Sequence, residues 1–251
     1  MVGSIMHLYG QYCPVARAAE ILADRWTVLI VRELLADVSH FNELQRGLPH
    51  MSRTLLAERL RRLERFGVLE RRIASRGKQT EYRLTAAGRE LQPIIDRFGE
   101  WGARWAFGDP RPSELDPIIL LWWMRRRVCI EAIGKRRVVI QFDFRSLRQD
   151  YWLLIERSDV SVCLKNPGFD IDVIVSADIR AFYQVWLGRM SFSEALCKEL
   201  VRLDAAPADA RAFPRWFAWS PMANAVRGAF ADRRVAARKS LPANRIMRRA
   251  G

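Results

Sequence analysis

The sequence predicts an α+β protein made of two parts, and three observations lead to this fold class. A basic amphipathic helix at 52–66 is followed at once by two short strands, 69–73 and 80–84, with a basic, glycine-containing tip between them. A stretch rich in proline and glycine then interrupts the chain at 108–113. Beyond it, a meander of strand-like runs precedes further helices.

The basic helix at 52–66 has a size and chemistry suited to double-stranded DNA. Ser52 is expected to cap it and Gly67 to end it. A helix of this length spans about 22 Å, which the major groove accepts. Three leucines at helical spacing predict its inward face: Leu56, Leu60 and Leu63. With the hairpin as a wing beside it, the sequence predicts a winged helix-turn-helix that binds DNA.

The remaining elements of this first part follow from caps and apolar spacing. Shorter helices are expected at 14–22, 26–35 and 41–46, with Asp24 capping the second and Gly47, Pro49 and His50 forming the turn before the basic helix. After the wing, Thr85 is expected to cap one long helix at 86–107. The apolar stripe of that helix exceeds what one domain needs, so the helix is expected to form a dimer surface. The stripe comprises Leu91, Ile94, Ile95, Phe98, Trp101 and Trp105.

The second part predicts helices around a set of strands. The expected helices span 118–133, 178–188, a stretch beginning at 191, and 209–219, and the expected strands span 138–144, 151–156, 160–164 and 171–175. The tail from Arg233 is basic and poor in apolar residues, so it is expected to be loosely ordered. These features divide the chain into residues 1–108, a linker at 109–115, a second domain at 116–220 and a tail at 221–251.

Composition narrows the class of protein. The formal charge is +14, and it is concentrated at 52–83, with ten Lys/Arg against four Asp/Glu, and at 233–251, with seven and none. Such charge favours a polyanionic partner. Four widely spaced cysteines and three scattered histidines predict neither a disulfide framework nor a metal site. The start lacks a signal-peptide pattern, and the longest apolar run, 118–124, is far short of a membrane span. A cytoplasmic protein without membrane insertion is therefore expected.

Several motifs resemble those of known families. Tyr12-Cys-Pro-Val, Asp24-Arg-Trp-Thr, Phe41-Asn-Glu-Leu, Leu60-Arg-Arg-Leu-Glu-Arg-Phe-Gly and Tyr82-Arg-Leu-Thr-Ala-Ala-Gly occur in the order found in the HxlR family, so residues 12–105 resemble those bacterial transcription regulators. Residues 116–217 resemble a sterol-carrier-like α+β domain with an apolar cavity, through the runs beginning at Asn166 and at Trp186. The first resemblance implies a homodimer whose two basic helices enter successive major grooves about 34 Å apart, and thus a pseudo-palindromic operator.

Candidate DNA contacts lie on the basic helix and the wing. They are Ser52, Arg53, Thr54, Glu58, Arg61, Arg62, Arg72, Arg76 and Lys78. Arginines can read guanine or hold phosphates, a helix N-terminus binds phosphate, and Glu58 can accept from a cytosine amine. The alternative interpretation is a solvated basic helix and hairpin tip that contact nothing.

Two further sets of residues suggest regulation. Cys13 precedes Pro14 at the start of a helix, where thiol pKa values fall, and cysteines at this place in HxlR proteins sometimes sense oxidants or electrophiles. The alternative is a small buried residue at a dimer contact. Aromatic side chains of the second part could line a pocket for an apolar effector, or they could simply fill the core. They include Trp122, Trp123, Phe142, Trp152, Phe182 and Trp186.

Two other classes of function stay open. A lipid or acyl-ligand carrier with basic surfaces would use the same aromatic residues. An enzyme finds little support, because the sequence contains no nucleophile elbow, phosphate loop or dinucleotide fingerprint, and no cofactor is expected. The acidic pair Asp170 and Asp172 is explained as solvated carboxylates.

Overall fold

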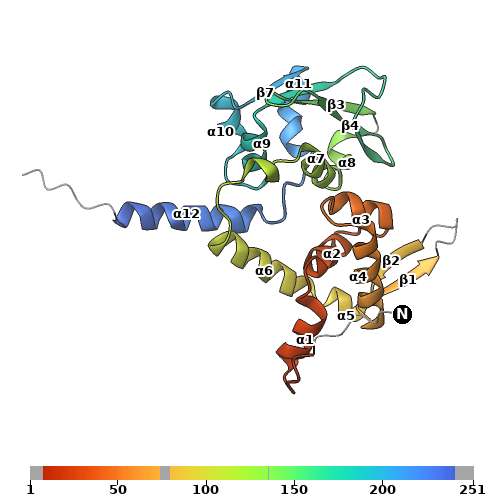
Figure 1. Cartoon of the computed structure of the whole chain (residues 1–251). Coiled ribbons are helices and arrows are strands. Elements are labelled where there is room, and N and C mark those ends of the chain that lie inside the picture. The colour runs from red at the N-terminus through yellow and green to blue at the C-terminus, as the bar shows by residue number, and fades with distance from the viewer. Residues whose placement is uncertain (1–7, 74–79, 135, 241–251) are drawn as a thin grey trace, which may run out of the picture. The chain divides into compact units, whose positions relative to one another are not determined.

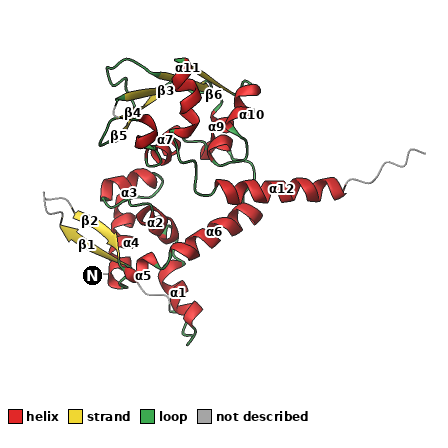
Figure 2. Ribbon diagram, turned by 180° about the vertical axis from the view of Figure 1, so that it is seen from behind, coloured by secondary structure: helices red, strands yellow, loops and turns green. Residues whose placement is uncertain are grey.

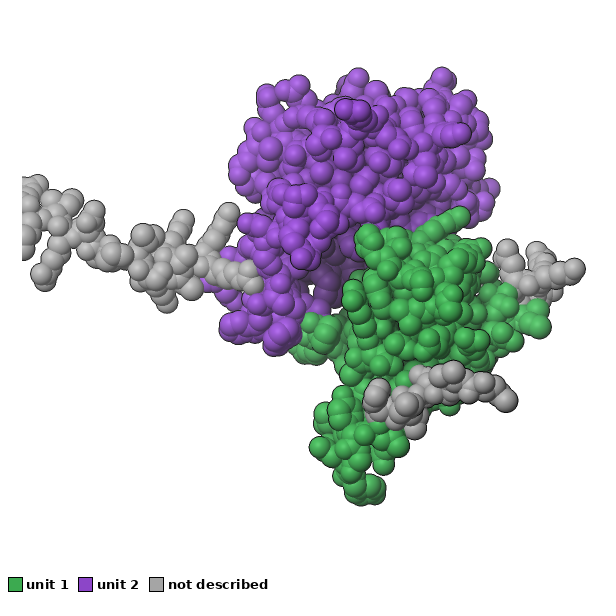
Figure 3. Space-filling view, viewed as in Figure 1, with its two compact units in different colours: residues 1–98 green, residues 99–251 purple. Residues whose placement is uncertain are grey.

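The protein was analysed as a computed structural model that describes residues 8–73, 80–134 and 136–240 (Figure 1). The chain forms two compact units, residues 1–98 and 99–251 (Figure 3). In the described part, no helix is both long enough and apolar enough to cross a lipid bilayer.

Unit 1 contains the expected winged helix-turn-helix. Its elements are α1 (Pro14–Leu22), α2 (Thr27–Leu35), α3 (Phe41–Gly47), α4 (Arg53–Arg65), β1 (Leu69–Ile73), β2 (Thr80–Leu84) and α5 (Ala86–Arg89). β1 and β2 pair antiparallel, from Leu69 opposite Leu84 to Ile73 opposite Thr80. The Tyr82 N–H also donates to the Ser39 carbonyl at 2.7 Å, so the stretch ahead of α3 lies along the outer edge of β2.

The predicted inward face of the basic helix is confirmed. Leu56, Leu60 and Leu63 are at most 1% exposed and pack into the core of unit 1. Leu44 of α3 and Ile30 of α2 lie in the same cluster. Burying a leucine stabilises a fold by about 1.5–3 kcal/mol, so these three side chains hold α4 firmly against α2 and α3.

Two expectations for the first part were wrong. Asp24 does not cap α2, because Trp26 occupies the cap position with a φ of 81° and no side-chain cap bond. The helix expected at 86–107 is broken into α5 and α6 (Gln92–Trp105). Pro93 explains the break, since in a continuous helix its ring would clash with the Arg89 carbonyl and its missing N–H would leave that carbonyl unpaired.

Unit 2 is an α+β fold around a five-stranded sheet (Figure 2). The strands are β3 (Val138–Phe144), β4 (Asp150–Ile155), β5 (Val160–Cys163), β6 (Val173–Ala177) and β7 (Val201–Ala205), in the order β5-β4-β3-β6-β7. Only the β3–β6 pair of this sheet is parallel. The helices are α7 (Pro117–Arg125), α8 (Ile130–Ile133), α9 (Ile179–Trp186), α10 (Phe192–Cys197), α11 (Pro207–Ala212) and α12 (Ala223–Ser240), with 3-10 turns at Pro112–Glu114 and Phe213–Arg215.

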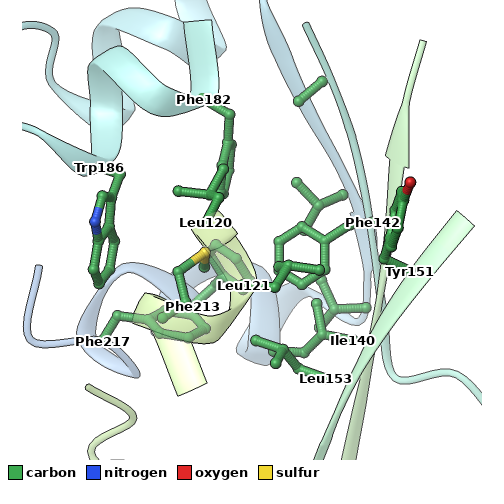
Figure 4. Close-up of a cluster of buried hydrophobic side chains, with 14 of the residues drawn as sticks. Leu120, Leu121, Ile140, Phe142, Tyr151, Leu153, Phe182, Trp186, Phe213 and Phe217 are labelled. Carbon is green, nitrogen blue, oxygen red and sulfur yellow. The ribbon is translucent and has the colours of Figure 1, made fainter. Parts of the chain in front are cut away.

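The core of unit 2 lies between one face of the sheet and the helices (Figure 4). Alternate residues of β3, such as Ile140 and Phe142, point into it and are fully buried. The Phe142 ring meets the Phe182 ring of α9 edge-on at 5.7 Å between centroids. Trp186 and Leu121 complete this part of the cluster. The packing fills the interior with aromatic rings.

Several predicted elements of the second part were wrong in extent. The helix expected at 118–133 is split, because Val128 forms a β-bridge with Phe217 between α7 and α8. The helix expected at 209–219 ends at Ala212 and gives way to the 3-10 turn that contains Pro214. The strand expected at 171–175 lies two residues further on, as β6 (Val173–Ala177). No strand was expected at the position of β7 (Val201–Ala205). The tail expected to be loosely ordered from Arg233 is helical through Ser240, as the second half of α12.

Candidate nucleic-acid interface

The turn before α4 is held by specific contacts. The Gln45 side-chain amide donates to the Met51 carbonyl at 2.6 Å. Leu48 and Met51 are each 2% exposed. The Ser52 hydroxyl accepts from the Leu55 N–H at 3.2 Å, as expected for a cap. The start of α4 is therefore fixed in direction and exposed to solvent.

The outward face of α4 carries the expected residues and one more. Thr54 and Arg61 are exposed, and Glu58 is partly exposed beside Arg59 at 3.2 Å. Arg65 is also exposed, and it was missed by the sequence reasoning. The helical spacing that places Thr54, Glu58 and Arg61 outward also includes Arg65, so the same periodicity could have found it.

Arg53 stands at the N-terminus of α4 and is oriented by α3. Both terminal nitrogens of its guanidinium donate to the Asn42 side-chain oxygen at 3.2 Å. The guanidinium also lies over the Phe41 ring, 4.9 Å from its centroid. Arg53 and Asn42 are both exposed. Asn42 was not among the expected residues, and it restricts the conformations of an arginine that is free on its outer side to meet an acceptor.

Arg62 has a different place from the one expected. Its side chain is only 12% exposed, and its guanidinium donates to the Glu20 carbonyl of α1 at 2.5 Å. It also lies 3.2 Å from the Asp24 carboxylate, which contacts Arg59 at 3.6 Å. Asp24 Oδ2 makes these ion-pair contacts without hydrogen-bond alignment. Arg62 thus attaches α4 to α1, and both Arg59 and Arg62 attach it to Asp24 in the segment after α1. A role of Arg62 in DNA binding stays a prediction.

The wing is described only at its base. Arg72 is exposed and pairs with Glu70 at 2.5 Å between nitrogen and oxygen. Arg71 is exposed beside it. Arg76 and Lys78, the expected contacts at the tip, lie outside the described residues.

Cys13 occupies the N-cap position of α1, as expected from Pro14. It is a free, partly exposed thiol, and its carbonyl accepts from the Arg17 N–H at 3.0 Å. The thiol makes no cap bond to the helix. Its position at a helix N-terminus is compatible with oxidation chemistry and with simple packing.

Most of the aromatic residues expected to line a pocket are buried, and the pocket itself stays a prediction. Five of the six residues are at most 8% exposed and are packed in the interior: Trp122, Phe142, Trp152, Phe182 and Trp186. Filling of the core, the alternative interpretation, therefore describes these five. Trp123 is partly exposed, with its ring edge-on to Tyr183 at 6.3 Å.

Comparison with known proteins identifies the family. Residues 21–109 match the HxlR-like helix-turn-helix family. The HTH-type transcriptional regulator YvaP of Bacillus subtilis, itself uncharacterized, is 37% identical over 108 residues, which cover 42% of this chain and 96% of YvaP. The chain belongs to the HxlR family. As an HxlR-family protein it is a bacterial helix-turn-helix transcriptional regulator.

Other relatives agree with this assignment. The HTH-type regulator sll1512 of Synechocystis is 34% identical over 97 residues, which cover 38% of this chain and 72% of sll1512. Among solved structures, the reduced form of the transcriptional regulator YodB from B. subtilis is 31% identical, with 38% of this chain and 95% of YodB covered and a TM-score of 0.34. The family match and the curated relatives confirm the resemblance to the HxlR family, whereas the sterol-carrier-like identity of the second domain stays a prediction.

Proposed function

We propose that this HxlR-family regulator acts as a homodimer that binds a pseudo-palindromic operator, with α4 of each protomer in a major groove. The observation that carries the proposal is the outward face of α4. It combines an exposed, capped N-terminus with Thr54, Arg61 and Arg65 along one line. In the described part of the chain, neither Arg61 nor Arg65 pairs with a carboxylate, so both guanidiniums can meet phosphates or guanine edges.

Each proposed contact has a distinct role. Arg53 and the N-terminus of α4 would bind phosphate or guanine, Glu58 would accept from a cytosine amine, and Arg72 with the tip residues Arg76 and Lys78 would contact phosphates. Ser52 contributes through its cap, because its hydroxyl is already bonded to the backbone. Specificity would thus come from α4 and a large part of the affinity from the wing.

The apolar face of α6 supports the dimer. Ile94, Phe98, Trp101 and Trp105 are 55–69% exposed, and their spacing of four, three and four residues places them on one side of the helix. A stripe of four large apolar side chains in water is unfavourable, and such patches commonly mark protein–protein contacts. Burial against the same stripe of a second protomer satisfies the symmetry of a two-fold dimer.

Selection of bound sequences from a random DNA library tests the operator. We expect a motif with two-fold symmetry and half-sites one helical turn apart. Arg61→Ala should then weaken binding and lower the slope of log K against log salt by about one unit, because one phosphate contact is lost. Arg148→Ala, which removes an exposed arginine of unit 2, is the matched control. An asymmetric motif, or equal effects of the two substitutions, contradicts the proposal.

Sedimentation equilibrium tests the dimer. Trp101→Glu places a charge in the α6 stripe and should shift the protein to monomer, with loss of operator binding. Ile118→Glu is the control, because Ile118 is also an exposed apolar residue but lies on α7. A protein that stays dimeric after Trp101→Glu would contradict a dimer through α6.

Regulation through Cys13 or through an apolar ligand of the second domain forms part of the same proposal. An effector can change operator affinity only by binding or modifying the two states of the protein unequally. Treatment with the thiol oxidant diamide should change the operator affinity of the native protein and leave that of Cys13→Ser unchanged. Cys197→Ser, which removes an exposed cysteine elsewhere, should respond like the native protein. If Cys13→Ser also responds, Cys13 is not the sensor.

A further inference from the structure

Unit 2 contains a pocket of about 570 Å³ that DNA binding does not use. The pocket is lined by the chain segment 106–111, which follows α6, and by Trp123 of α7 with Tyr183, Gln184 and Leu187. The volume lies within the range of roughly 300–1,000 Å³ found for small-molecule sites. The pocket lies outside the aromatic core. Of the six aromatic residues expected to line a ligand pocket, Trp123 is among the residues that line this one.

We propose that this pocket binds a small, uncharged aromatic molecule that carries one hydrogen-bonding group. The binding itself is independent of the DNA-binding proposal, and only its regulatory consequence rests on that proposal.

The apolar surface of the pocket favours a flat ring system. Trp123 and Tyr183 meet edge-on and present ring surface, with Leu187 and Phe107 beside them. The Tyr183 hydroxyl donates to the Asp116 carbonyl at 2.7 Å. Burial, together with the Asp116 charge, raises the pKa of Tyr183, so the phenol stays neutral at physiological pH. Aromatic rings packed in this way commonly form the walls of sites for apolar ligands.

The charges around the pocket are matched within the protein, which argues against an ionic ligand. Arg189 is only 14% exposed, donates to the Asp109 carboxylate at 2.8 Å and to the Gly108 carbonyl at 3.2 Å, and lies over the Phe230 ring. Arg111 pairs with Glu114 at 2.6 Å. Two cations therefore face two carboxylates. A charged ligand beside Arg189 would have to separate its pair with Asp109 or lose its own hydration without compensation.

Gln184 provides the polar group. Gln184 of α9 lines the pocket, and in the described part of the chain its side-chain amide makes no hydrogen bond. An amide both donates and accepts, so it can bind a hydroxyl, amine or carbonyl on the ligand. A single polar group among apolar walls sets the orientation of a ligand more than it adds affinity.

The position of the segment 106–111 gives binding a structural consequence. Arg189 holds the segment through Gly108 and Asp109, and Arg180 donates to the Pro110 carbonyl at 2.8 Å. A ligand between this segment and α9 would add contacts on its inner side. The ligand should therefore slow the hydrogen exchange of the backbone amides at 106–111.

The test uses the full-length protein and the probe N-phenyl-1-naphthylamine, an uncharged aromatic amine that fluoresces in apolar surroundings. We expect saturable binding of one probe per chain. The sulfonated analogue 8-anilino-1-naphthalenesulfonate differs mainly by its charge and should bind at least about tenfold more weakly. Hydrogen exchange at 106–111, followed by mass spectrometry, should slow with the neutral probe. Equal or tighter binding of the sulfonate would overturn the inference.

Matched substitutions locate the probe. Ala106 is an exposed pocket residue, so Ala106→Trp fills the pocket from its outer side and should weaken binding at least about tenfold. Ala208→Trp adds the same side chain at an exposed position on α11 and should bind like the native protein. If both variants bind alike, or if the native protein binds no probe, the pocket is not a ligand site. Operator binding by Ala106→Trp, measured separately, shows whether the DNA-binding proposal stands in either case.

Discussion

Replacing Arg62 with methionine should destabilise unit 1 by about 2–3 kcal/mol without removing a DNA contact. The substitution removes the bond to the Glu20 carbonyl and the ion pair with Asp24. A hydrogen bond to a charged group contributes about 1.5–3 kcal/mol. The ion pair adds less, because the Asp24 side chain is 35% exposed and keeps Arg59 as a partner. Methionine retains most of the apolar stem, so lost packing adds little.

A far-UV circular dichroism melt measures this effect. For a unit of about 100 residues, each kcal/mol lowers Tm by roughly 4–8 °C, so the loss of about 2–3 kcal/mol should lower the Tm of unit 1 by roughly 8–24 °C. Arg61→Met, one residue away on the exposed side, should leave Tm nearly unchanged and reduce operator affinity instead. The reasoning fails if the two variants melt together, or if Arg62→Met loses operator affinity while its Tm stays native.

Three further predictions, two on substitutions and one on cysteine alkylation, follow from the burial of single residues. Leu60→Ala should lower the free energy of unfolding in urea by about 2–5 kcal/mol, because Leu60 is 1% exposed on the inner face of α4, and a loss under 1 kcal/mol would contradict its placement. Gly188→Ala should cost more than Gly168→Ala: both have φ near +80°, but only at Gly188 would the new Cβ meet a backbone oxygen, at 2.7 Å. Burial raises the pKa of Cys163, so at pH 8 it holds less thiolate and iodoacetamide should alkylate it more slowly than exposed Cys197. The difference between the two alkylation rates should narrow as pH rises. Equal rates at pH 8, measured by peptide mass spectrometry, would contradict the raised pKa of Cys163.

Local signals made the winged helix-turn-helix predictable. Ser52 and Gly67 mark the ends of the basic helix, and three leucines at helical spacing define its buried side. The break at Pro93 was equally local, but the apolar stripe on both sides of it favoured one continuous helix. Strand β7 was not predictable in this way. Its run Val-Arg-Leu-Asp-Ala is short and charged, and it becomes a strand through pairing with β6.

The candidate site was also predictable only where local sequence signals determine which residues are exposed. Thr54, Glu58 and Arg61 follow from the helix period alone, and Arg65 could have followed. Arg62 lies at the margin of that face, and its burial depends on Glu20 and Asp24, about forty residues away in sequence. The pocket in unit 2 depends in the same way on chain segments that only the tertiary fold brings together. Periodicity predicts which side of a helix is buried, whereas the partners of residues at the margin come from the fold.

Several arginines of this protein have a structural role, because their guanidiniums donate hydrogen bonds to backbone carbonyls of distant segments. Arg127 reaches the carbonyls of Ala218 and Trp219, Arg180 that of Pro110, and Arg62 that of Glu20. A guanidinium can serve two acceptors in fixed directions, whereas a lysine ammonium on a flexible stem does not reproduce this geometry. A high isoelectric point therefore overstates the surface offered to nucleic acid. Exchanging these arginines for lysine would keep every formal charge and still loosen the chain, so the choice of cation, more than the number of cations, is what the fold requires.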